Sequence, residues 1–188
     1  MDDDRTPAVR LEPWSEGDAE LLRALNAPEL MTHLGGPESE EALARRHRRY
    51  VDLTADSTRA GRMFRIVLPP TGAAAEATAE ATAGAIGFWE REWAGEQVYE
   101  TGWAVLTAFQ GRGVATAAAR AVAERARAEG LHRHLHAFPK VDHPASNAVC
   151  RAAGFELLGP QDFEYPAGHP IRCNDWRLDL GPSDRGER

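Results

Sequence analysis

Two glycines stand where a loop passes into an alanine-rich segment: Gly111 and Gly113 come just before Val114. A helix that begins here presents backbone N–H groups without internal partners and a partial positive charge, and both attract an anion. Glycine lets the backbone approach that anion closely and permits unusual dihedral angles. Arg112 adds a charge and Thr116 adds a hydroxyl. The chemistry that this stretch indicates is phosphate binding.

The stretch matches neither of two common phosphate-binding motifs. It lacks the G-K-[S/T] of a nucleotide P-loop, and the third glycine and the spacing of the dinucleotide fingerprint are missing. From the residues alone, two interpretations therefore stay open. One is a phosphate-binding helix start, and the other is a plain tight turn between a strand and a helix.

Three histidines raise the question of a metal site. His132, His134 and His136 alternate, so they share one face of a predicted strand. A strand sets these side chains well apart, and no acidic or cysteine ligand cluster accompanies them in the sequence. The two cysteines, Cys150 and Cys173, form no C-x-x-C pair and are expected to be free thiols. We expect no metal, and a histidine-lined face against a helix or solvent.

Size and charge limit the class of protein. The 188 residues suffice for one well-buried domain, and the formal net charge of -7 argues against a general nucleic-acid binder. The acidic start "MDDDRTP" lacks the basic and apolar regions of a signal peptide, and no apolar run approaches membrane-spanning length. We therefore expect a cytoplasmic protein with no nucleic-acid and no membrane partner.

Hydrophobic patterning predicts a single α/β domain over 8–180, between flexible termini at 1–7 and 181–188. The alanine-rich stretch 71–84 has no large apolar side chain to bury, so we expect a mobile loop there. Strands are predicted at 8–13, 62–70, 84–93, 97–106, 131–138, 155–159 and 171–180, and helices at 16–26, 39–52, 113–129 and 144–154.

The order of these elements predicts the topology of the sheet. Strand 97–106, helix 113–129 and strand 131–138 form a β-α-β crossover, which makes its two strands parallel. The strands before this crossover are expected to pair antiparallel. The expected architecture is a central mixed sheet of six to seven strands with helices on both faces.

The stretch Gln110 to Ala115, "QGRGVA", resembles the Q/R-x-x-G-x-G/A motif of the GCN5-related N-acetyltransferase (GNAT) superfamily. Downstream, "HPASNAVCRAAGFE" is similar to a second motif region of that family, and the predicted order of elements agrees with its fold. The loop "HLGG" and the "Asp-Trp" of the last strand look most like the RimJ/RimL-type branch. The likeness covers about residues 8–180, although Thr107 stands where many members have proline.

The resemblance implies acetyl-CoA as the co-substrate. The preceding strand is then expected to carry a bulge and to splay from its parallel neighbour, so that the backbone of Val105 pairs with the pantetheine arm. Gln110 is expected to brace the loop. Asn147 either hydrogen-bonds the pantetheine or is a surface residue of its helix. The backbone amides expected at the pyrophosphate are those of Gly111, Arg112, Gly113, Val114, Ala115 and Thr116.

The resemblance also implies direct transfer of acetyl to an amine, which must lose a proton before it attacks. Glu100 is the candidate base, unless it makes only a structural hydrogen bond or salt bridge. The N–H of Val105 is the candidate oxyanion donor. Cys150 stands at the tyrosine position of the family and either acts as the acid or packs the helix. Ser146 and Tyr165 are further candidate donors.

A second departure from the family is His143, which occupies an asparagine position and either keeps that hydrogen-bonding role or loses it. The function that the resemblance implies is acetylation of a primary amine on a protein N-terminus, a polyamine, an amino acid or an antibiotic. The acceptor site is expected between the loops at 30–37 and 165–171. The alternative is a non-catalytic acyl-CoA-binding or sensing module. Exposed strand edges make a homodimer the expected assembly if one forms.

Overall fold

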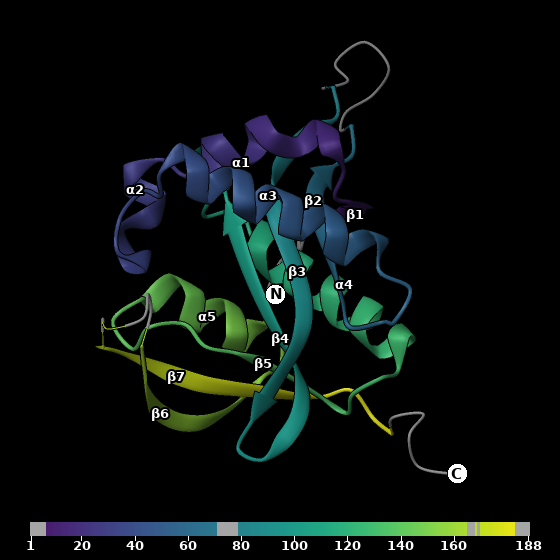
Figure 1. Ribbon diagram of the computed structural model, residues 1–188, viewed down its shortest axis with the longest axis vertical. Helices are drawn as coiled ribbons and strands as arrows, with labels where there is room; N and C mark the ends of the chain where they lie inside the picture. The colour runs from purple at the N-terminus through teal and green to yellow at the C-terminus, as the bar shows by residue number, and fades with distance from the viewer. Residues whose placement is uncertain (1–6, 71–78, 165–167, 169, 183–188) are drawn as a thin grey trace, which may run out of the picture.

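The computed structural model describes residues 7–70, 79–164, 168 and 170–182 (Figure 1). Seven strands form a single sheet in the order β1-β2-β3-β4-β5-β7-β6, and β4 and β5 are its parallel pair. The mixed α/β sheet that the sequence predicts is therefore confirmed. The strands are β1 (Arg10–Pro13), β2 (Gly61–Leu68), β3 (Ala81–Trp93), β4 (Glu96–Val105), β5 (His134–Ala137), β6 (Glu156–Glu164) and β7 (Pro170–Asp179).

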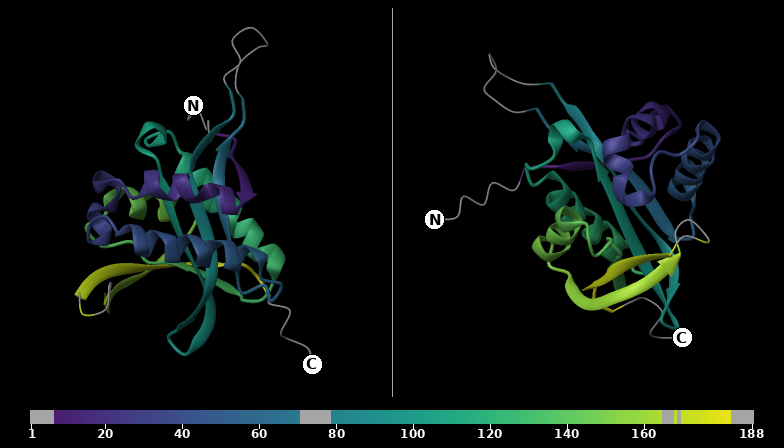
Figure 2. Two further views of the ribbon diagram at one scale, coloured as in Figure 1. Left: turned by 45° about the horizontal axis from the view of Figure 1, so that its top comes forward. Right: turned by 90° about the vertical axis from the view of Figure 1, so that its left-hand side faces the viewer.

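Helices cover both faces of the sheet, as expected (Figure 2). α1 and α3 lie over one face and enclose a smaller core cluster with Trp14 and Met63. α4 and α5 lie over the other face, where the larger cluster is centred on Phe88 and Tyr99. The α-helices are α1 (Ala19–Leu25), α2 (Pro28–Met31), α3 (Glu40–Ala55), α4 (Val114–Glu129) and α5 (Pro144–Ala152), and the 3-10 turns are η1 (Glu16–Asp18), η2 (Thr32–Leu34) and η3 (Thr107–Phe109).

Alanine determines how α4 packs. Ala118 and Ala119 are fully buried against the sheet, together with Val122. Short side chains let the helix backbone approach the strands closely, and a helix with so many alanines also has high intrinsic propensity. Gly130, with φ of 64°, ends the helix in the left-handed conformation that is typical of a glycine after a helix.

Several predicted boundaries differ from the structure. The helix expected at 16–26 is divided into η1 and α1, where Ser15 and Asp18 form a capping box. Part of the expected loop around residue 35 is helical, as α2 and η2. The prediction of a mobile loop at 71–84 is wrong for 81–84. These residues form the start of β3 and pair with β2 or β4. They can do so because small alanines and a glycine fit between close strands. Residues 71–78 lie outside the described part.

The β6–β7 hairpin is longer than predicted, because cross-strand pairing extends β6 to Glu164. β5 is shorter than the predicted 131–138, so His132 precedes the strand. Within the described residues, no helix is long and apolar enough to cross a membrane.

Candidate active site

β4 and β5 separate soon after they meet. They pair only at Tyr99 with Leu135 and at Glu100 with His136, although β4 continues to Val105. The sheet is therefore open between the two strands beyond Glu100. This splay confirms one part of the expected geometry.

The expected bulge in β4 is wrong. The register of β3 with β4 runs without a shift from the pair Gly84 and Val105 to the pair Trp93 and Glu96. The strands separate because β5 is short and turns away after Ala137, so β4 does not need an extra residue. The register shifts in this sheet lie instead in β2–β3 and in β6–β7.

The backbone of β4 presents free polar groups to the gap. The N–H of Leu106 donates to the carbonyl of Ala83, so Leu106 faces β3. Since N–H and C=O of alternate residues point to opposite sides of a strand, the main-chain groups of Thr101, Trp103 and Val105 point away from β3 and toward the gap. The parallel pairing of Glu100 with His136 uses the N–H of Thr101, and β5 does not pair with Trp103 or Val105. The edge of β4 can therefore hydrogen-bond an extended ligand arm in the gap, as it would another strand.

The glycine loop lies at the end of the same strand. Gln110 Nε2 donates to the carbonyl of Val105 at 2.9 Å, which ties the loop to β4 as the expected brace. Gly111 and Gly113 have φ of 70° and 77°, a left-handed region that disfavours other residues. Gly111, Arg112 and Gly113 are exposed.

The first turn of α4 is open to an anion. No side chain caps the helix at Gly113, and the first turn carries no acidic residue. The amides of that turn lack partners within the helix, since its first internal bond runs from the N–H of Ala117 to the carbonyl of Gly113. Val114 anchors the turn with a buried side chain, while Ala115 and Thr116 are half-buried.

Glu100 lies at the start of the gap and already has a partner. Its Oε2 accepts a hydrogen bond from Arg91 Nη1 at 2.5 Å, and the two side chains are 20% and 29% exposed. The salt bridge that the sequence allowed as an alternative role therefore exists. It places a carboxylate beside the gap, with Oε2 held by the guanidinium of Arg91.

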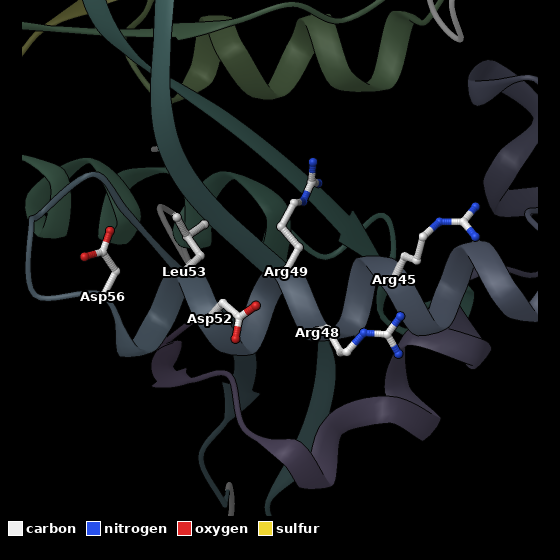
Figure 3. Close-up of a pocket in the computed structure, with 6 residues that line it drawn as sticks. All are labelled: Arg45, Arg48, Arg49, Asp52, Leu53 and Asp56. Carbon is white, nitrogen blue, oxygen red and sulfur yellow. The ribbon is translucent and has the colours of Figure 1, made fainter.

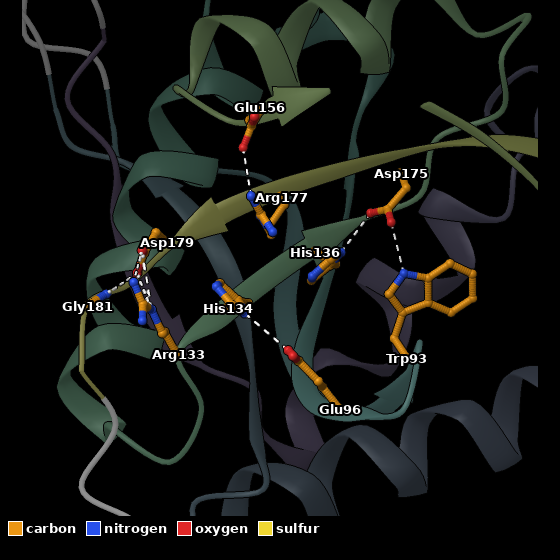
Figure 4. Close-up of polar contacts among 10 residues, drawn as sticks. All are labelled: Trp93, Glu96, Arg133, His134, His136, Glu156, Asp175, Arg177, Asp179 and Gly181. Carbon is orange, nitrogen blue, oxygen red and sulfur yellow. Dashed lines mark hydrogen bonds and ion pairs between the residues drawn. The ribbon is translucent and has the colours of Figure 1, made fainter. Parts of the chain in front are cut away.

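A buried histidine–aspartate pair lies next to Glu100 in the sheet. His136 Nδ1 is 2.7 Å from Asp175 Oδ1, and Trp93 Nε1 donates to Asp175 Oδ2 at 2.8 Å (Figure 4). The carboxylate thereby fixes the orientation of the imidazole. Sequence reasoning missed this pair, because residues on β5 and β7 that are far apart in the chain carry no local signal.

The chain matches the family model "Acetyltransferase (GNAT) domain" over residues 8–156. It belongs to the GNAT family of acetyltransferases. Among curated proteins no sequence match is found. The GNAT chain does resemble many solved structures, and these likenesses show the shared fold.

An acetyltransferase from Salmonella typhimurium that modifies the N-terminal serine of ribosomal protein L7/L12 is 20% identical, with a TM-score of 0.70 over 92% of this chain and 95% of that one. A spermidine N-acetyltransferase from Vibrio cholerae, in complex with CoA and spermine, is 15% identical, with a TM-score of 0.68 over 92% and 95%. The aminoglycoside acetyltransferase AAC(6')-Ib, in complex with coenzyme A, is 17% identical, with a TM-score of 0.69 and the same coverage.

Asn147 has a different role from both of those expected of it in a GNAT chain. Its amide lies in the interior at 8% exposure, so it is not a surface residue. Nδ2 donates to the carbonyls of Lys140 and His143, and Oδ1 accepts from Asn174 Nδ2 and Trp176 Nε1. Because two donors and two acceptor sites are all that an amide offers, none is left for pantetheine. Asn147 joins α5 to β7 instead.

Replacing Asn147 with alanine is expected to lower the free energy of unfolding by roughly 2–4 kcal/mol, because each buried donor that loses its partner costs about 1–3 kcal/mol. Chemical denaturation measures the change, with Ser146→Ala in the same helix as the control at about 0.5 kcal/mol or less. Full stability of the variant together with weaker acetyl-CoA binding would restore the pantetheine role.

Cys150 packs the helix and is not suited to act as the general acid. Its side chain is fully buried in the larger core cluster beneath α4. Burial raises the pKa of the Cys150 thiol to about 12, which makes it a poor proton donor at neutral pH. We therefore leave Cys150 out of the proposed chemistry. Ser146 is half-buried in the first turn of α5, and Tyr165 lies outside the described residues.

His143 has lost hydrogen bonding through one ring nitrogen. Its ring stacks on that of His33 from η2 at 4.0 Å, and Nδ1 is buried without a partner among the described residues. Burial, with His33 nearby, lowers the pKa of His143, so the stacked imidazole is neutral at pH 7. The contact ties η2 to the start of α5.

The histidines of the β5 region have separate partners. His132 contacts Glu90, His134 lies 3.6 Å from Glu96, and His136 is paired as described. The described residues contain no group of three or more potential metal ligands.

A surface hollow lies along α3 (Figure 3). It is lined by Arg45, Arg48, Arg49, Asp52, Leu53 and Asp56. None of these belongs to the predicted site. The structure thus brings together the glycine loop, the open edge of β4 and Glu100, and it separates Cys150 and Asn147 from them by burial.

Proposed function

We propose that this GNAT chain transfers an acetyl group from acetyl-CoA directly to a primary amine. The observation that carries the proposal is the continuity of two features: the open backbone edge of β4 and the uncapped, glycine-lined start of α4. One fits an extended arm and the other fits a pyrophosphate, as acetyl-CoA requires. Structural neighbours of the same fold, such as a RimL acetyltransferase, hold coenzyme A.

The roles of the residues follow from this arrangement. The amides from Gly111 to Thr116 would bind the pyrophosphate, and the gap-facing backbone of Trp103 and Val105 would hold the pantetheine arm. The N–H of Val105 is our candidate donor to the oxyanion. Since Val105 already gives its carbonyl to Gln110, its N–H is the group that remains for a ligand.

The reaction needs a base, because an alkylammonium must become a neutral amine before it attacks. Glu100, beside the gap, is the proposed base. The new C–N bond forms as the C–S bond of the thioester breaks. Of the two protons that the ammonium loses overall, one passes through Glu100 to solvent and the other reaches the leaving thiolate. Ser146 and Tyr165 stay candidates for the final donor.

The acceptor is a primary amine of unidentified structure. Structural neighbours act on a protein N-terminal serine, on aminoglycosides and on spermidine, so the fold itself does not select among these acceptors. The departures at Cys150 and His143 favour, as a second candidate, a chain that binds acyl-CoA without turning it over. Both candidates require acetyl-CoA binding, and substitution of Glu100 distinguishes them.

Acetyl-CoA is expected to raise the midpoint of thermal unfolding well beyond the effect of ADP. A ligand that binds only the folded state adds about 2.7 kcal/mol of stability at about 100 times its dissociation constant. ADP is the control because it shares the diphosphate but lacks the pantetheine arm. Equal midpoints with and without acetyl-CoA would mean that the glycine loop is only a turn, and the proposed function would be wrong.

A further inference from the structure

Three aromatic side chains form a box on the face of the sheet that carries Glu100. Trp93 comes from β3, Phe138 follows β5, and Phe163 comes from β6. The ring centroids of Trp93 and Phe138 are 4.9 Å apart, and each lies 5.0 Å from that of Phe163. All three side chains are only partly buried. The three rings pack directly on one another, and the group that lies against one side of them is charged.

The guanidinium of Arg91 lies against one side of the box, within cation–π distance of all three rings. Its carbon lies 4.7 Å from the ring centroid of Phe138, 5.0 Å from that of Phe163 and 5.2 Å from that of Trp93. The same guanidinium donates to Glu100 at 2.5 Å. Aromatic faces attract a cation, and a carboxylate completes the charge balance. The box with Glu100 is therefore a site built for a planar or compact cation.

The position of the site matches that of an acceptor. In the register of β3 with β4, Arg91 and Trp93 share a face with Glu100, which pairs with Trp89. Glu100 is also the last residue of β4 that pairs with β5 before the gap opens. The box therefore lies beside Glu100, at the end of the gap away from Val105, on the face opposite α4. Arg91 is partly exposed and lies close to the hairpin turn at Gly95, so its long side chain has room to move into solvent.

We propose that the box of Trp93, Phe138 and Phe163 binds a cationic group of the acceptor, an alkylammonium or guanidinium, and that Arg91 holds this place until the acceptor displaces it. The inference rests on the proposed function, because that function supplies the acceptor. It specifies the chemical class of that molecule as cationic at the bound end. Displacement of Arg91 also frees the Glu100 carboxylate, so acceptor binding and release of the base are one event.

The test uses the indole N–H of Trp93, which donates to Asp175, as a reporter in proton–nitrogen NMR spectra. Methylguanidinium chloride is titrated into the wild type and into Arg91→Ala, with sodium chloride at equal ionic strength as the reference. The matched control is Arg49→Ala, because the guanidinium of Arg49 also lies over a ring, that of Tyr50 at 5.6 Å, but on α3. Arg91→Gln keeps most of the stem if the alanine variant unfolds.

We expect methylguanidinium to bind Arg91→Ala at least tenfold more tightly than the wild type or Arg49→Ala. Adding Phe138→Leu and Phe163→Leu to Arg91→Ala should remove this binding. An indole signal that does not respond in Arg91→Ala, or that responds equally in the wild type, would overturn the proposal and leave Arg91 as a structural side chain. The unfolding midpoint with acetyl-CoA is measured on the same samples. The titration then tests cation binding at the box, and the midpoint separately tests the acetyl-CoA binding that the proposed function requires.

Discussion

Replacing Glu100 with glutamine is expected to slow acetylation by about 10²- to 10⁴-fold, the usual contribution of a positioned general base. Glutamine has nearly the shape of glutamate but accepts no proton. Acetyl-CoA binding should change little, since the amides of the glycine loop and the backbone of β4 hold that ligand. The measurement is release of free CoA thiol with the amine that an acceptor screen identifies, alongside the unfolding midpoint with acetyl-CoA.

Glu96→Gln is the matched control for this experiment. Glu96 starts the same strand but is exposed and faces His134 at 3.6 Å (Figure 4). Normal turnover in Glu96→Gln with lost turnover in Glu100→Gln identifies the carboxylate at the gap as the base. If Glu100→Gln acetylates as fast as the wild type, Glu100 is only the structural partner of Arg91, and the base must be sought elsewhere, first at His136.

Gly111→Val is expected to weaken acetyl-CoA binding by at least tenfold, a loss of about 1.4 kcal/mol. A Cβ at Gly111 meets no atom within 4 Å, so the fold has space for the side chain. That open space is where the pyrophosphate would approach the amides, and a branched side chain there keeps it away. Isothermal titration with acetyl-CoA measures the effect.

Backbone strain is the competing explanation, and Gly181→Val tests it. Gly181 has φ of 92° and also finds no atom within 4 Å of an added Cβ, but it follows β7. Both variants force a side chain into the left-handed region, at about 1–2 kcal/mol of stability each. Reduced affinity only in Gly111→Val indicates a binding loop. An equal loss of affinity in both variants, or unchanged affinity in both, contradicts the assignment of the glycine loop to the pyrophosphate.

The local sequence determined the features whose physics is local. A glycine that needs a positive φ, an acid three residues after a serine cap and an alanine-rich inner face act over a few neighbouring residues. The unusual dihedral angles of Gly111 and Gly113 and the crossover through α4 were therefore predicted correctly, and the capping box at Ser15 is a local feature of the same kind. The family motifs are short for the same reason, so the resemblance was evident before the structure.

Tertiary structure decided which polar groups are already satisfied. The amide of Asn147 is fully used because α5 packs on β7, and Cys150 is buried because the same helix faces the core. Arg91 reaches Glu100 and the aromatic box only because strands from distant parts of the chain lie side by side. Burial, pairing and pKa depend on neighbours in space, and a sequence pattern with a period of a few residues does not contain them.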